Sequence, residues 1–186
     1  MTHFRRRTGF WLLVLAAAGC GGGPEAPSSL PPWSGTQGTV VVPVANEGWA
    51  HVIEGSVLRF TANPPASGAH YPVWGRYEEF TAVLPRGYWV HNLEHGAIVF
   101  AYRPDAPPAV VSALRDVYRA LTPDAVCGHS LALMTPDPEL PRPVAVLAAD
   151  WALTAEGVDA ATITAFVAAR RTVSYTHLTL PTNREV

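Results

Sequence analysis

Five histidines in the middle of the chain have a spacing that could support metal or acid–base chemistry. Two of them, His91 and His95, lie in the segment Val-His-Asn-Leu-Glu-His-Gly (residues 90–96). If this segment forms a helical turn that ends at Gly96, residues i and i+4 share one face, so both imidazoles can reach one metal ion. Glu94 lies beside them and could be a ligand, an orienting group or a general base.

His70 ends a second distinctive segment, and His51 precedes it. The segment Asn-Pro-Pro-Ala-Ser-Gly-Ala-His (residues 63–70) contains two prolines and a glycine, which restrict the backbone and hence the direction of the imidazole. Histidine is the commonest metal ligand, and three or four converging imidazoles suit copper or zinc. We therefore predict a copper or zinc site with His51, His70, His91 and His95 as ligands. Each ring taken singly could instead be an ordinary histidine hydrogen-bonded to the backbone.

Three further side chains could extend a soft copper site. Cys127 and His129 lie in a Cys-Gly-His segment, and Met134 follows it. Thiolate and thioether groups are ligands that copper accepts. A cysteine can equally act as a small buried apolar side chain, and a methionine as core filler. We favour this second interpretation for Cys127 and Met134.

Other functions also fit the histidine-rich segment. His91, Glu94 and His95 match the His-x-x-Glu-His motif of inverzincin metalloproteases, but that motif belongs on a long helix, whereas Gly96 and an apolar run follow here. Two alternatives stay open: a histidine- or metal-dependent hydrolase with Glu94 as base, and a non-catalytic binding or assembly module of the cell envelope. The aromatic residues before His91 could also line a pocket for an apolar or sugar-like ligand. Metal binding without catalysis is the leading hypothesis.

The elements that must position these residues mix strands and helices without a regular repeat. The pattern predicts an α+β fold: a single two-layer domain with a small mixed sheet, two main helices and a long loop rich in proline, glycine and aromatic residues. Asp159 is the expected N-cap of the last helix, which turns Ile163, Phe166 and Val167 inward. The other expected elements are strands at 39–44, 57–61, 97–102 (the central strand), 131–134 and 144–149, a helix at 108–121, and the loop at 62–90.

The N-terminus is typical of an exported lipoprotein. Arg5, Arg6 and Arg7 precede an apolar run at residues 10–18, which is too short to span a bilayer comfortably and suits a signal peptide. The run leads into Ala-Ala-Gly-Cys, which resembles a lipobox, so we expect residues 1–19 to be removed and Cys20 to carry lipid. Residues 20–38 then form a flexible tether. The chain is predicted to be extracytoplasmic, in the periplasm or on the cell surface, with the membrane as its partner through the lipid anchor. The alternative is an ordinary secretory signal.

The C-terminal residues 173–186 match the translation of a sequencing-library adapter, so we exclude them and expect the folded domain to cover residues 39–172. Residues 20–172 carry nine arginines and 14 acidic residues, a net charge of −5. An acidic domain without a basic stripe argues against nucleic acid as a partner. If Cys20 is lipidated, Cys127 is the remaining thiol, so we expect no internal disulfide.

The two histidine-containing segments also carry a family resemblance. Residues 63–70, residues 90–96, the strand that follows and Tyr-Arg-Pro at 102–104 resemble the bacterial family known as domain of unknown function 3105. The resemblance extends from about His51 to Arg170. Ala66 departs from it, because the family usually has threonine there, and Cys127 and His129 are not part of its motifs. The resemblance implies an extracytoplasmic or membrane-associated protein and names no activity.

Overall fold

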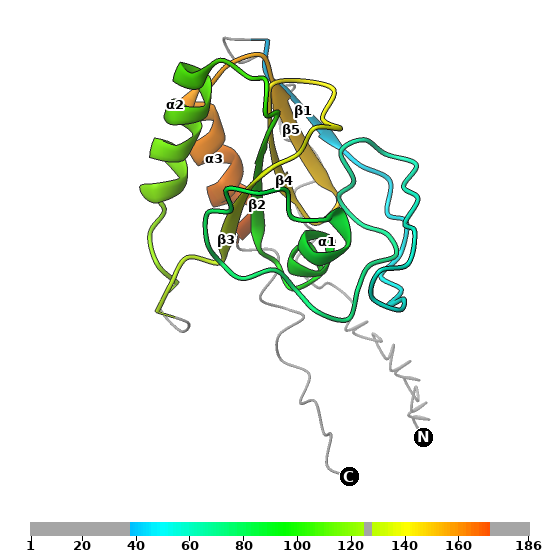
Figure 1. Cartoon of the computed structure of the whole chain (residues 1–186). Coiled ribbons are helices and arrows are strands. Elements are labelled where there is room, and N and C mark those ends of the chain that lie inside the picture. Colours follow the sequence, from blue (N-terminus) through cyan, green and yellow to red (C-terminus); the bar gives the residue numbers. More distant parts are fainter. Residues whose placement is uncertain (1–37, 125–127, 172–186) are drawn as a thin grey trace, which may run out of the picture. The chain divides into compact units, whose positions relative to one another are not determined.

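A mixed β-sheet is the centre of the fold. The structure is a computed structural model that describes residues 38–124 and 128–171, and within these residues the chain forms one five-stranded sheet in the order β1-β5-β4-β2-β3 (Figure 1). Strands β2 and β3 are parallel and joined through α2, and the other neighbours are antiparallel. The strands are β1 (Val40–Pro43), β2 (Ile98–Tyr102), β3 (Ala132–Pro136), β4 (Val144–Ala148) and β5 (Trp151–Ala155).

Helices α2 (Pro108–Arg119) and α3 (Ala160–Arg171) cover one face of the sheet (Figure 1). Alternate residues of β2, β3 and β4 point toward them, so this core contains Phe100, Met134 and Val146 from the strands and Leu114 and Phe166 from the helices. Proline at the first position of α2 suits a helix start, because the nitrogen there needs no partner. Asp159 caps α3 by accepting a hydrogen bond from the Thr162 amide at 3.1 Å.

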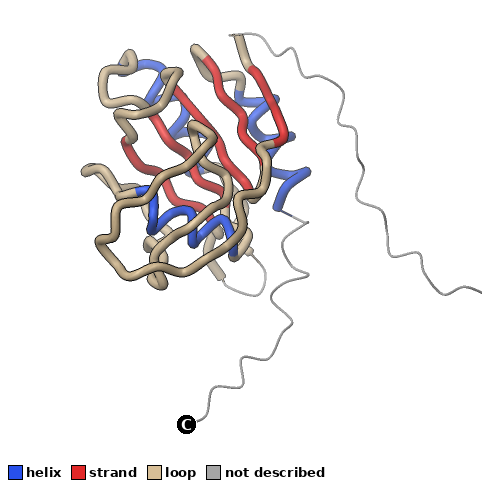
Figure 2. The backbone as a smooth tube through the Cα atoms, turned by 90° about the vertical axis from the view of Figure 1, so that its right-hand side faces the viewer, coloured by secondary structure: helices blue, strands red, loops and turns tan. Residues whose placement is uncertain are grey.

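Helix α1 (Arg86–Glu94) and the loop at residues 44–85 cover the other face. Figure 2 views the sheet from this side, with α1 and the loop in front of the strands. Trp89 and Leu93 of α1 pack against residues of the sheet such as Val99, and Phe60 and Phe80 of the loop pack against the same cluster. Since both faces are covered, β2, β3 and β4 are apolar on both sides rather than alternating.

The α+β class with one mixed sheet is confirmed, and most predicted elements are present. The strand predicted at 57–61 is wrong: this segment has no strand partner, and Leu58 instead packs against Gly87 of α1. The structure adds β5, which the sequence analysis did not predict, and α1 begins at Arg86 rather than forming one turn. Strand β2 lies inside the sheet, between β4 and β3.

The predicted N-terminal segments at 1–37, Cys127, and the segment 173–186 lie outside the described residues. Within the described part of the chain, no helix is both long enough and apolar enough to cross a bilayer.

Glu79 attaches the long loop to α2 beside the edge strand β3, and its carboxylate gives the fold a pH dependence. It accepts hydrogen bonds from Arg115 at 2.5 Å and from Arg119 at 3.0 Å. Burial acts to raise the pKa of Glu79, but these hydrogen bonds and the two positive charges outweigh burial and hold the pKa below its usual value. The stabilisation is therefore present above the unfolded-state pKa of about 4.3 and is lost as the pH falls through the lower folded-state pKa.

We expect Glu79→Gln to lower the free energy of unfolding by about 1 kcal/mol at pH 7, because a partly buried ion pair is lost. The difference from wild type should shrink as the pH falls from about 5 to about 3, where the wild-type carboxylate becomes protonated. Urea unfolding of wild type and variant at pH 7 and at about pH 3 measures this difference. Glu156→Gln, at a largely exposed carboxylate 3.6 Å from Arg142, is the control. An equal loss at pH 7 and pH 3 would contradict the assignment.

Candidate metal centre

Four of the predicted side chains and Glu94 come together beside the end of α1. Ligand atoms of His51, His70, His91 and Glu94 all lie within 4.8 Å of one another. His95 joins them, because its Nε2 is 2.9 Å from the Nε2 of His91 and 4.0 Å from the carboxylate of Glu94. The cluster thus draws on residues more than 40 positions apart in the sequence.

The long loop supplies His51 and His70 as neighbours on two paired segments. The Val52 amide donates to the His70 carbonyl at 2.8 Å, and the His70 amide donates to the Ala50 carbonyl at 2.9 Å. This short parallel bridge places the two imidazoles side by side, with ring centroids 4.8 Å apart. A third bond, from the Gly68 amide to the Gly48 carbonyl, continues the pairing. The backbone pairing of the loop therefore fixes the Cα positions of both His51 and His70.

The end of α1 supplies His91, Glu94 and His95. The helix ends at Glu94 with His95 as its C-cap, and Gly96 adopts a left-handed φ of 80°. The Gly96 amide donates to the Leu93 carbonyl at 2.9 Å, which satisfies one of the final carbonyls of the helix. The prediction that Gly96 ends a helical turn carrying His91 and His95 is confirmed. Their rings stack with centroids 4.8 Å apart.

The two buried histidines are held in one orientation by the backbone. His70 is 0% exposed and its Nδ1–H donates to the Gly68 carbonyl at 2.8 Å, while His91 is 3% exposed and its Nδ1–H donates to the Tyr71 carbonyl at 2.7 Å. Because a carbonyl accepts only, the proton of each neutral ring is on Nδ1, so each Nε2 turns a lone pair toward the cluster. The Nε2 of His91 accepts from the Nε2 of His95 at 2.9 Å. Metal-binding histidines are held in this way by their second nitrogen.

The centre of the cluster holds more acceptors than donors. Oε2 of Glu94 is 3.1 Å from Nε2 of His70 and 3.5 Å from Nε2 of His51. With the His70 proton on Nδ1, its Nε2 and the carboxylate oxygen are both acceptors, so a proton or a cation must lie between them. Burial lowers the pKa of His91, although the hydrogen bond to the Tyr71 carbonyl acts to raise it. The ring of His91 is therefore neutral at pH 7, the form that binds metals.

The remaining candidates lie elsewhere. His129 is exposed and its ring is 5.3 Å from that of Tyr77, outside the cluster. Met134 is fully buried in the core under α2 and α3, in agreement with its interpretation as core filler. Cys127 lies outside the described residues. The His-x-x-Glu-His sequence sits at the end of α1, so the structure does not provide the long helix of a metalloprotease motif.

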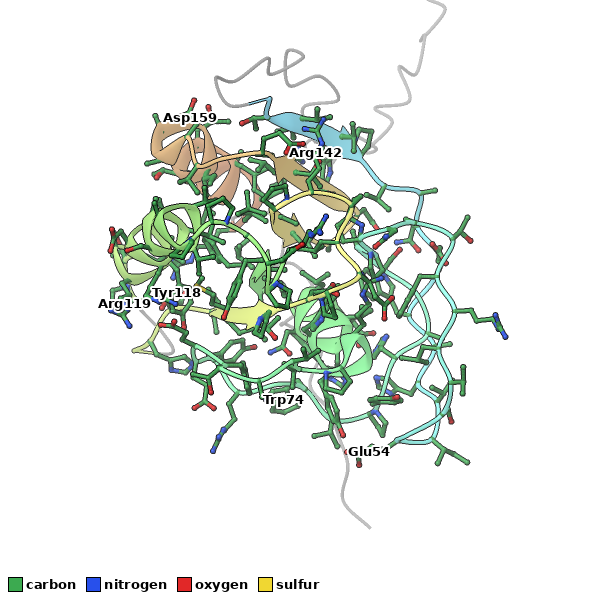
Figure 3. The ribbon with its side chains drawn as sticks, turned by 45° about the horizontal axis from the view of Figure 1, so that its top comes forward. Glu54, Trp74, Tyr118, Arg119, Arg142 and Asp159 are labelled. Atoms are coloured by element: carbon green, nitrogen blue, oxygen red, sulfur yellow. The ribbon has the colours of Figure 1, made fainter. Side chains whose placement is uncertain are left out.

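Two residues beside the cluster were not recognised in the sequence analysis. Trp74 lies next to α1 (Figure 3), with its ring 5.5 Å from that of His91 and 5.8 Å from that of His95. Asn92 is fully buried and bonds to Gly75, next to Trp74. For Asn92, the position between His91 and His95 was the one feature of the sequence that could have indicated a role at the site.

Fold and site together define an α+β domain with a polyhistidine and carboxylate centre at the end of a buried helix. The family comparison agrees with the resemblance noted above. Residues 51–180, more than half of the chain, match the family model described as protein of unknown function (DUF3105), and the chain belongs to this family. The match begins at His51 and includes every residue of the cluster. No curated protein and no solved structure gives a significant match.

Proposed function

We propose that the protein binds one divalent transition-metal ion, copper or zinc, through the clustered histidines. His51, His70 and His91 and the carboxylate of Glu94 are the proposed ligands, with His95 as an additional one. The observation that carries this proposal is the pair of buried imidazoles whose Nδ1–H groups are bound to backbone carbonyls. Their Nε2 lone pairs therefore face the cluster: that of His70 lies beside the Glu94 carboxylate, and that of His91 lies beside Nε2 of His95. A cation between these acceptors removes the unfavourable contact between them.

The donor set favours a borderline metal ion. Imidazole nitrogens with one carboxylate oxygen are ligands of zinc and copper(II), whereas copper(I) prefers sulfur, and no thiolate is part of the cluster within the described residues. Zinc–nitrogen bonds of about 2.0–2.1 Å place tetrahedral ligand atoms about 3.3 Å apart. The outermost pairs, up to 4.8 Å apart, must therefore approach one another. His51 has room to move, since its side chain is 52% exposed.

The convergence of the rings also supports metal binding over an assembly module with scattered structural histidines. For the rest of the chain we propose the placement expected from its sequence: export, anchoring of Cys20 in the membrane through lipid, and no nucleic-acid partner. An extracytoplasmic metal-binding domain on a flexible tether is consistent with these segments.

Metal analysis of protein purified without a polyhistidine tag tests the proposal. After dialysis against zinc or copper(II) and removal of free ions, we expect about one ion per chain in the wild type. His91→Ala should lose at least nine tenths of the metal, because it removes a preoriented ligand. His129→Ala is the matched control, because it removes an exposed histidine outside the cluster. Equal metal content in wild type, His91→Ala and His129→Ala would overturn the proposal.

A further inference from the structure

Trp74 is an exposed aromatic side chain whose position the rest of the fold fixes. Its side chain is 54% exposed, although an indole ring gains most from full burial. Its ring packs against two imidazoles of the cluster, tilted by 54° to His91 and nearly edge-on, at 69°, to His95. Figure 3 shows it beside α1, on the same side of the domain as Glu54. Core packing alone does not explain a tryptophan that is about half exposed.

A pair of hydrogen bonds fixes the backbone next to Trp74. The side-chain amide of Asn92 donates to the Gly75 carbonyl and accepts from the Gly75 amide, both at 2.8 Å. Gly75 is closely surrounded, since a Cβ there would lie 2.6 Å from Cδ2 of Leu84 and 3.3 Å from Oδ1 of Asn92, so a side chain would require Leu84 to move. Asn92 is fully buried, so both bonds are shielded from water. The loop is thereby attached to the same helical turn that carries His91 and His95.

His95 is the side chain whose position depends on Trp74. It lies at the end of α1, is 42% exposed and, unlike His70 and His91, has no backbone carbonyl bonded to its ring among the described contacts. Its ring is restrained by the 2.9 Å bond between its Nε2 and Nε2 of His91, by stacking on the His91 ring and by the edge contact with Trp74. A half-exposed imidazole without such contacts would sample several rotamers.

We propose that Trp74 is a positioning residue of the metal centre: it holds the His95 imidazole against His91 and shields the exposed side of the centre from water. This inference rests on the proposed function, because it assigns Trp74 to retention of the bound ion. An ion whose ligand His95 stays in place and whose surroundings exclude water dissociates more slowly. Asn92 acts one step further away, by fixing the backbone that carries Trp74.

The test compares Trp74→Ala and Trp74→Phe with Val73→Ala, which removes the neighbouring exposed apolar side chain. In metal-free protein, proton NMR of the imidazole Cε1–H signals reports the position of each ring relative to the indole. Trp74→Ala should shift and broaden the His95 signal and shift that of His91, while leaving His70 unchanged, and Trp74→Phe should largely restore both. In zinc-loaded protein, capture of the ion by excess chelator should be about tenfold faster for Trp74→Ala than for Val73→Ala.

The two measurements separate this inference from the proposed function. If wild-type protein holds no metal, the proposed function fails, and the retention role assigned to Trp74 fails with it, whatever the NMR signals show. If the wild type holds one ion but Trp74→Ala releases it at the Val73→Ala rate and leaves the His95 signal in place, the metal centre stands and the inference about Trp74 is overturned. Faster release together with a shifted His95 signal and recovery in Trp74→Phe supports it.

Discussion

Replacing Glu94 with glutamine is expected to lower the affinity for zinc or copper(II) about 100-fold and to leave the metal-free protein at least as stable as the wild type. The first effect follows from charge, because the carboxylate is the proposed anionic ligand and glutamine is a neutral side chain of the same shape. Its oxygen Oε2 lies 3.1 Å from His70, 3.5 Å from His51 and 4.0 Å from His95.

The retained stability of the metal-free variant follows from the hydrogen bond that a glutamine can form with His70. In the metal-free wild type, the Nε2 lone pair of His70 faces a carboxylate oxygen, and this acceptor pair requires an added proton. A glutamine can turn its amide –NH₂ toward that lone pair and donate a hydrogen bond, which contributes about 1 kcal/mol. The same substitution therefore weakens the metal complex and gives the His70 lone pair a hydrogen-bond donor in the metal-free protein. A purely structural role for Glu94 does not produce this combination.

Competition titration with a chelator measures the first effect, and urea unfolding in the presence of excess chelator measures the second. Glu78→Gln is the matched control, since Glu78 is a half-buried carboxylate paired with Arg76 outside the cluster. Wild-type metal affinity in Glu94→Gln would show that Glu94 is not a ligand. A metal-free variant less stable than wild type by more than about 1 kcal/mol would show that the hydrogen-bond argument is wrong.

The parts of the site that could be predicted from the sequence are those set by short-range geometry. The spacing of His91 and His95 and the glycine after them define one face of a helix end, whatever the rest of the fold does. The predicted cap of α3 at Asp159 is equally local. The restricted turn at residues 63–70 also led us to place His70 at the same site, before the family resemblance was considered.

The meeting of these segments depends on long-range packing and could not be derived from the local pattern. His51 reaches the cluster through backbone pairing with the segment of His70, and α1 is buried on most of its surface. A helix buried on most sides has no amphipathic stripe, so its first turns gave no periodic signal. Strand β5 was missed because its hairpin from β4 turns at Asp150, with a φ of 60°, without the glycine that commonly marks such turns. The role of Trp74 depends on the contact between Asn92 and Gly75, which no spacing encodes.

Arg86→Ala is expected to lower the free energy of unfolding by about 3 kcal/mol, the largest stability effect that we predict for one substitution. Arg86 is the first residue of α1, and its side chain is 14% exposed. Its Nε and Nη2 lie 3.0 and 2.9 Å from one carboxylate oxygen of Asp137, which is 4% exposed, and Nη2 also donates to Asn63. Without the guanidinium, the carboxylate of Asp137 stays buried and, among the contacts of the described residues, keeps only the bond from the Glu139 amide to its other oxygen.

Arg86 also connects the two histidine-containing segments of the site. It joins the start of the helix that carries His91 and His95 to Asn63, which begins the turn that ends at His70.

Guanidinium chloride unfolding measures the loss of stability. Arg103→Ala is the control, because its partner Asp105 is mostly exposed and such pairs contribute less than about 1 kcal/mol. Adding Asp137→Asn to Arg86→Ala should recover part of the loss, since a neutral amide is less costly to bury unpaired than a carboxylate. If the double variant is no more stable than Arg86→Ala, the buried charge is not the cause, and the bond to Asn63 accounts for the loss instead.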